Sequence, residues 1–188
     1  MAHSRRAAGR KTDSGFDSLV LAEVSAVQIR QADIADAPVV AQLFRASFRH
    51  TYPHFPELHT AEEDLQFFST TVFPQNRVYV AEAGGSDAQE RIVGFIAFTS
   101  EMVNQLYILP DATGQGVGTA LLAVAIAHCK TGNEASLQLW TFQCNLRARN
   151  FYSKHGFKEV RETDGAENEE CQPDVLLEYR PAQTHGLR

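Results

Sequence analysis

Three glycines in the segment TGQGVGTALL, Gly114, Gly116 and Gly118, alternate with other residues directly before an apolar helical pattern. Glycine accepts a positive φ and lets the backbone come close to an anion. The first N–H groups of a helix have no partner inside the helix, and the helix dipole attracts negative charge. The segment therefore predicts a turn that binds a phosphate through its backbone.

Two common phosphate-binding motifs do not fit this turn. A P-loop needs a lysine after its last glycine, and none follows Gly116 or Gly118. A dinucleotide-binding turn, G-x-G-x-x-G, would need glycine where Thr119 or Leu121 stands. The interpretations left open by the glycines alone are a purely structural turn and a site for the pyrophosphate of coenzyme A.

A second segment, NLRARNFYSKHGF, follows the next expected strand and supplies a phenol and an amide. Asn145, Ala148, Phe151 and Tyr152 occur at the spacing N-x-x-A-x-x-F-Y, and Gly156-Phe157 comes shortly afterwards. With the glycine turn, in this order and in these expected elements, the segment resembles the GCN5-related N-acetyltransferase superfamily. The resemblance covers roughly residues 26–180.

The resemblance implies a binding site for acetyl-CoA, as co-substrate, and no metal. The family loop Q/R-x-x-G-x-G/A corresponds to Thr113 through Gly118, and Thr113 stands where the family usually has Gln or Arg. We expect this change to weaken the hold on the pyrophosphate without abolishing it, because backbone N–H groups do most of the binding. The residues expected to bind the coenzyme are Ile108, Thr113, Gly114, Gln115, Gly116, Val117, Gly118, Thr119, Asn145 and Tyr152.

The same resemblance gives three residues a role in the chemistry. A backbone N–H near Ile108 would polarise the thioester carbonyl, on a central strand that splays from its neighbour to leave a slot. Tyr152 would be the general acid for the thiolate leaving group; a purely structural, buried tyrosine is the alternative. Asn145 would hold the pantetheine arm, begin its helix as an N-cap, or do both.

The group that takes the proton from the amine is less defined in the sequence. Glu101 begins the expected central strand and is one candidate base. His54 and His59 lie in a connector that would flank the acceptor site, and histidine has a suitable ordinary pKa. Ordinary surface or packing roles are the alternative for both histidines.

An acidic stretch near the C-terminus, Thr163–Val175, is expected to overhang the acceptor site. Glu169, Glu170 and Asp174 could recruit a cationic amine there. The alternative is a solvated acidic loop in which Asp174 braces the turn.

These observations predict an acetyl-CoA-dependent N-acetyltransferase that acts on a primary amine of a small molecule. The amine would attack the thioester directly in a ternary complex. The alternatives are a non-catalytic acyl-CoA-binding regulatory module and a protein or peptide N-acetyltransferase. A homodimer is an expectation drawn from the resemblance.

The composition is that of an ordinary folded protein: 188 residues, 44% hydrophobic and 21% charged. The net charge of −6 argues against binding to a nucleic-acid backbone, and no apolar run is long enough to cross a membrane. Three widely spaced cysteines predict neither disulfides nor a zinc site, so we expect a cytoplasmic protein. We expect one domain over residues 26–182, between tails at 1–25 and 183–188.

The elements that must position these groups follow from hydrophobic periodicity and caps. The expected fold class is a mixed α/β (α+β) arrangement like that of the family that the sequence resembles. It would have a mostly antiparallel central sheet of about six to seven strands, flanked by about four helices. A helix from Thr60 to Pro74 should begin with a T-x-x-E capping box and bury Leu65, Phe68 and Val72. Strands are expected at residues 26–33, 77–83, 91–100, 101–109, 135–142, 157–162 and 173–180, and further helices after residue 33, after Gly116 and over 145–156.

Overall fold

The computed structural model describes residues 27–84, 91–132 and 134–181. The expected tails, and the two end residues of the expected domain, lie outside these ranges. The described strands are β1 (Gln28–Gln31), β2 (Arg77–Ala83), β3 (Arg91–Phe98), β4 (Val103–Ile108), β5 (Leu137–Phe142), β6 (Lys158–Glu162) and β7 (Asp174–Tyr179). The helices are α1 (Ala37–Thr51), α2 (Ala61–Phe67), a π-helical turn at Phe68–Val72, α3 (Phe73–Gln75), α4 (Val117–Thr131) and α5 (Leu146–Lys154), with 3-10 turns at Ile34–Asp36 and Pro110–Ala112.

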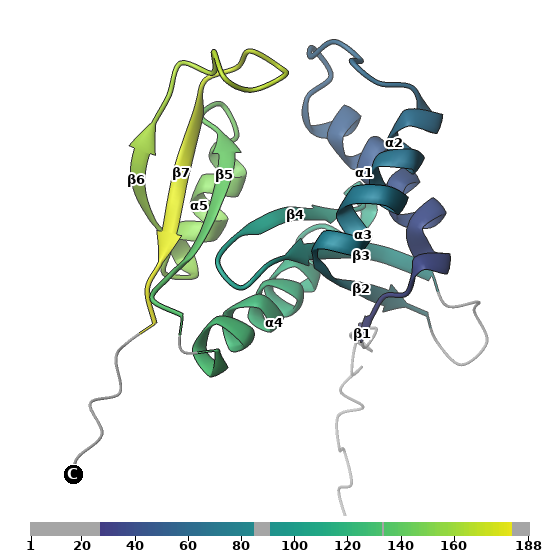
Figure 1. Cartoon of the computed structure of the whole chain (residues 1–188), viewed down its shortest axis with the longest axis horizontal. Coiled ribbons are helices and arrows are strands. Elements are labelled where there is room, and N and C mark those ends of the chain that lie inside the picture. Colours follow the sequence, from purple (N-terminus) through teal and green to yellow (C-terminus); the bar gives the residue numbers. More distant parts are fainter. Residues whose placement is uncertain (1–26, 85–90, 133, 182–188) are drawn as a thin grey trace, which may run out of the picture.

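The strands form two antiparallel sheets, which lie side by side in Figure 1. The first has the order β1-β2-β3-β4 and the second the order β5-β7-β6. β3 is buried along almost its whole length, as its nearly continuous apolar sequence predicts for a central strand. The expected mixed, mostly antiparallel fold is confirmed, with its seven described strands divided between two sheets.

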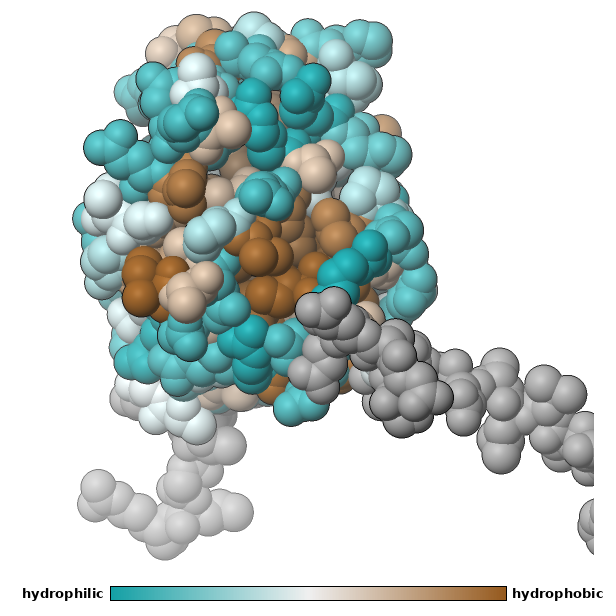
Figure 2. Space-filling view, turned by 90° about the vertical axis from the view of Figure 1, so that its right-hand side faces the viewer, coloured by the Kyte–Doolittle hydropathy of each residue, from teal (hydrophilic) through white to brown (hydrophobic). Residues whose placement is uncertain are grey.

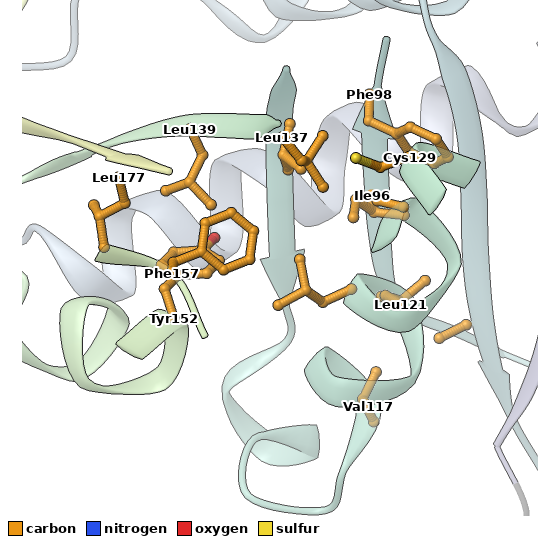
Figure 3. Close-up of a cluster of buried hydrophobic side chains, with 14 of the residues drawn as sticks. Ile96, Phe98, Val117, Leu121, Cys129, Leu137, Leu139, Tyr152, Phe157 and Leu177 are labelled. Atoms are coloured by element: carbon orange, nitrogen blue, oxygen red, sulfur yellow. The ribbon is translucent and has the colours of Figure 1, made fainter. Parts of the chain in front are cut away.

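Two apolar clusters hold the helices on the four-stranded sheet. One cluster joins α4 to this sheet and continues under the second sheet, where Tyr152 of α5 lies among Phe157, Leu139 and Leu177 (Figure 3). The other joins α1 and the π-helical turn to the opposite face of the sheet. α4 and α1 therefore cover opposite faces of the sheet that ends in β4 (Figure 1).

Local signals in the sequence begin these helices as expected. Thr60 accepts a hydrogen bond from the backbone of Glu63, whose side chain accepts one from the backbone of Thr60, and this is the predicted capping box. Asn145 caps α5 by accepting from the N–H of Ala148 at 3.0 Å. Gly156, with φ of +89°, follows the end of the same helix.

Two details of the sequence interpretation were wrong. The strand expected to begin at Glu101 begins at Val103, because Glu101 lies in the tight turn that joins β3 to β4. Leu65 is 37% exposed, since the inward position on that turn of α2 belongs to Asp64, which is 6% exposed. Arg45 of α1 binds the Asp64 carboxylate at 2.7 Å, and this pairing allows a charged group to be buried there.

The side of the molecule with α1, α2 and β1 is shown in Figure 2. Apolar side chains gather in the middle of this face and hydrophilic ones surround them. Exposed apolar residues of the described chain include Ile34, Val39 and Leu65. No described helix has the length and apolar character needed to span a bilayer.

Candidate active site

The glycine turn connects the end of β4 to the start of α4. Gly114 and Gly116 have φ values of +81° and +83°, which side chains other than glycine rarely adopt, and Gly116 is the N-cap residue of α4. A Cβ added to either would have nothing within 4 Å. The space above the turn is therefore open, and these glycines are required by backbone conformation.

The backbone N–H groups of this turn point to no acceptor in the described part of the protein. From Gly114 to Thr119, six consecutive amides donate no hydrogen bond to a described residue, and the first amide with a partner is that of Ala120, which donates to Gly116 at 3.0 Å. The side chains of Thr113 and Gln115 bond instead to the carbonyls of Pro110 and Asp111. They brace the turn, and the backbone is left to bind an anion.

Two parallel strands, β4 and β5, meet only where they start. Met102 and Gln138 form a single bridge there, and the N–H of Gln138 donates to the carbonyl of Glu101 at 2.7 Å. Beyond this point the strands separate and belong to different sheets. The start of α4 lies beside the far end of β4, since a Cβ on Gly118 would be 3.9 Å from Ile108 Cγ1.

A cavity of about 580 Å³ fills the space between the separated strands. Its walls come from β4, β5, α1, α2, α5 and the loop between β6 and β7. Tyr152 and Asn145 line it, as do His59, Glu169, Glu170 and Asp174. The structure thus brings these six expected site residues to one place.

The free edge of β4 faces this cavity. Tyr107 pairs with Phe95 and Leu109 donates to Val93 at 2.8 Å, so these odd-numbered residues direct their backbone groups toward β3. Because this direction alternates along a strand, the N–H groups of Leu106 and Ile108 point away from β3, toward the cleft. The buried hydroxyl of Ser47 donates to the carbonyl of Ile108 at 3.0 Å and fixes this end of the strand.

Tyr152 is 8% exposed and reaches the cavity from α5. Burial raises its pKa above the ordinary value for a tyrosine, so the phenol keeps its proton at neutral pH. Asn145 caps α5 and also donates from Nδ2 to the hydroxyl of Tyr52 at 2.6 Å. Its role as an N-cap, one of the two expected, is confirmed.

The connector after α1 and the acidic loop face each other over the cavity (Figure 1). His59 Nε2 lies 2.9 Å from a carboxylate oxygen of Glu169, and this contact joins them. Glu169 raises the pKa of His59 through this hydrogen bond. Asp174 bonds to Thr163 and Asn168. These bonds brace the loop, which is the alternative role that the sequence suggested for Asp174.

Two of the residues expected around the acceptor lie away from the cavity lining, which also does not include Ile108 or the glycine turn. His54 is an exposed residue of the connector, and Glu101 is an exposed residue of the β3–β4 turn, at the end where β4 and β5 are joined. Sequence reasoning missed Tyr52, Ser47 and the N–H of Leu106. The N–H of Leu106 could have been predicted only because alternate residues of a strand direct their N–H groups to the same side, so that Leu106 shares the direction of Ile108. No local sequence pattern indicates Ser47 or Tyr52.

Comparison with known proteins decides the family. The model of the acetyltransferase (GNAT) domain family matches residues 74–159. An uncharacterized N-acetyltransferase of Archaeoglobus fulgidus is 24% identical over 145 residues, which cover 70% of this chain and 93% of that protein. The chain belongs to the GCN5-related N-acetyltransferase superfamily. It is therefore an acetyltransferase.

Two further proteins place this acetyltransferase among its relatives. The peptidyl-lysine N-acetyltransferase YjaB of Salmonella typhimurium is 28% identical over 134 residues, covering 70% of this chain and 83% of YjaB. The PaiA N-acetyltransferase of Thermoplasma acidophilum, solved in complex with coenzyme A, has the same fold: the TM-score is 0.65 at 22% identity, with 83% of this chain and 99% of that one covered.

Proposed function

We propose that this acetyltransferase moves the acetyl group of acetyl-CoA to the primary amine of a small molecule, in a ternary complex. One observation carries the proposal. The six amides from Gly114 to Thr119 that have no acceptor in the described chain follow the C-terminal end of β4, the strand whose residues Val103 to Tyr107 line the cavity. A pyrophosphate carries two negative charges and fits such a row of donors at a helix start.

The free edge of β4 suits the pantetheine arm and the thioester. Amides of the arm would pair with the backbone of β4 like an added strand. The N–H groups of Leu106 and Ile108 are the donors available on this edge, and one of them would polarise the thioester carbonyl. The sequence predicted this role for a backbone N–H near Ile108, and Leu106 offers a second donor on the same edge of β4.

The transfer itself follows from the groups around the cavity. The acceptor ammonium first loses a proton, the free amine forms a C–N bond at the carbonyl carbon, and the C–S bond breaks. Tyr152 donates a hydrogen bond or its proton to the departing sulfur, and the proton released by the new amide nitrogen restores the phenol. Because burial raises the pKa of Tyr152 and a thiol has an ordinary pKa of about 8.5, hydrogen bonding contributes more than complete transfer.

A small acceptor is favoured over the side chain of a folded protein. The contact of His59 with Glu169 bridges two loops above the cavity and would have to open for a protein surface to enter. YjaB is named for peptidyl-lysine, so peptides belong in any test of acceptors.

The test compares acetyl transfer by the wild type and the variant Tyr152→Phe on a panel of small amines and lysine peptides. We expect the variant to lower kcat by about 100-fold or more while its Kd for coenzyme A stays within about twofold of wild type. Tyr79→Phe is the control, because Tyr79 bonds His128 and lies outside the cavity lining. Tight coenzyme binding without transfer to any amine would support the non-catalytic module instead.

A further inference from the structure

The charged side chains that line the cavity are almost all acidic. Among these lining residues, all in the described part of the chain, there is no lysine or arginine. Such a cavity attracts cations and repels carboxylates and phosphates. The charged and titratable residues other than tyrosine on its walls are His59, Glu63, Asp64, Glu169, Glu170 and Asp174.

Four of the five carboxylates already have partners. Asp64 binds Arg45, Glu63 completes the cap of α2, Glu169 binds His59 and Asp174 binds Thr163. The side chain of Glu170 differs, since it makes no hydrogen bond or ion pair with any residue that the structure describes. It is the carboxylate left to meet a ligand.

Glu170 is partly buried and lines this cavity as well as a smaller one beside it. Burial raises the pKa of Tyr52 and of Tyr107, and the negative charge of Glu170 adds to both shifts. The carboxylate thus shares the cavity with two phenols, that of Tyr52 directly after α1 and that of Tyr107 on β4, both distant in sequence from the acidic loop. An ammonium group placed between them would be near the free edge of β4.

The rest of the wall is aromatic. Phe44, Phe48 and Tyr107 line the cavity, with Phe44 edge-on to Tyr107 at 5.0 Å between ring centroids. Trp140 and Phe142 of β5 also line it. Aromatic faces pack against apolar groups and also attract cations.

We propose, on the basis of the function proposed above, that the acceptor is a small cationic amine with an aromatic body and no anionic group, and that Glu170 receives its ammonium. The carboxylate accepts a hydrogen bond from the ammonium, and the aromatic walls bury the remainder of the molecule. A carboxylate on the same molecule would lie among the acidic groups without a basic partner.

Two probes of matched shape test this. 2-Phenylethylamine and phenylalanine differ by one carboxylate, and we expect kcat/KM to be higher for 2-phenylethylamine by about 100-fold or more. Glu170→Gln should lower kcat/KM for 2-phenylethylamine by roughly 10- to 100-fold and leave the Kd for coenzyme A unchanged. Glu167→Gln is the matched control: Glu167 is an exposed acid of the same loop that does not line the cavity.

Equal kcat/KM for the two probes, or equal effects of Glu170→Gln and Glu167→Gln, would overturn the inference. If no amine is acetylated although coenzyme A binds, the proposed function fails by itself. Calorimetric titration of the coenzyme-saturated protein with each probe then still decides: the inference requires that 2-phenylethylamine binds more tightly than phenylalanine and that only Glu170→Gln removes the difference.

Discussion

Replacing Gly116 with alanine separates two roles of the glycine turn. Gly116 has φ of +83°, where a residue with a Cβ costs about 1–2 kcal/mol, and the new methyl group meets nothing within 4 Å. Loss of stability should therefore be limited to this cost, a fall in Tm of roughly 2–8 °C for a chain of this size. The methyl group would, however, project into the open space above the unpaired amides.

We expect coenzyme A to bind this variant about 10- to 100-fold more weakly. This corresponds to the loss of one hydrogen bond to a charged group, about 1.5–3 kcal/mol. Calorimetric titration with coenzyme A gives the Kd, and thermal unfolding without coenzyme gives the Tm.

Gly156→Ala is the matched control for this experiment. Gly156 has φ of +89°, and its added Cβ would make only ordinary contacts, 3.5 Å from the ring of Tyr179. The two variants should lose similar stability, but only Gly116→Ala should weaken coenzyme binding. A similar Kd for both variants would refute the argument that the turn binds the pyrophosphate through its backbone.

Two further results are expected. Arg45→Met should lower the free energy of unfolding by about 2–4 kcal/mol, because it leaves the buried carboxylate of Asp64 without its cation. Arg49→Met should lower it by less than about 1 kcal/mol, because the Arg49 side chain is 60% exposed. Urea unfolding measures the free energy of unfolding of both variants. Because the pKa of His59 is raised, its pairing with Glu169 stabilises the fold fully below about pH 6.5, and this stabilisation is lost as the pH rises through the raised pKa. NMR titration should show that the pKa of His59 falls in the variant Glu169→Gln. An unchanged pKa would contradict the contact.

Local features of the fold could be predicted from the sequence because their physics is local. The capping box at Thr60, the N-cap at Asn145 and the positive φ of Gly116 each depend on a few neighbouring residues. The separation of β4 from β5 was expected only from the resemblance to the family. No periodicity within either strand indicates that its neighbour turns away.

The remaining site features depend on contacts between distant segments. Ser47 of α1 bonds to Ile108, and Tyr52, which directly follows α1, bonds to Asn145; nothing near them in sequence indicates those partners. Asp64 was missed in a different way, because a hydrophobic pattern assigns its inward position to an apolar residue. Its burial depends on Arg45, which is 19 residues away.

The most direct test of the account is a structure of the protein with coenzyme A bound. We predict that the pyrophosphate oxygens accept hydrogen bonds from amides between Gly114 and Thr119. The sulfur should lie in the cavity between β4 and β5, within reach of the Tyr152 hydroxyl. A pyrophosphate bound away from this turn, or a sulfur outside that cavity, would contradict the central claim that the glycine turn and Tyr152 serve one thioester.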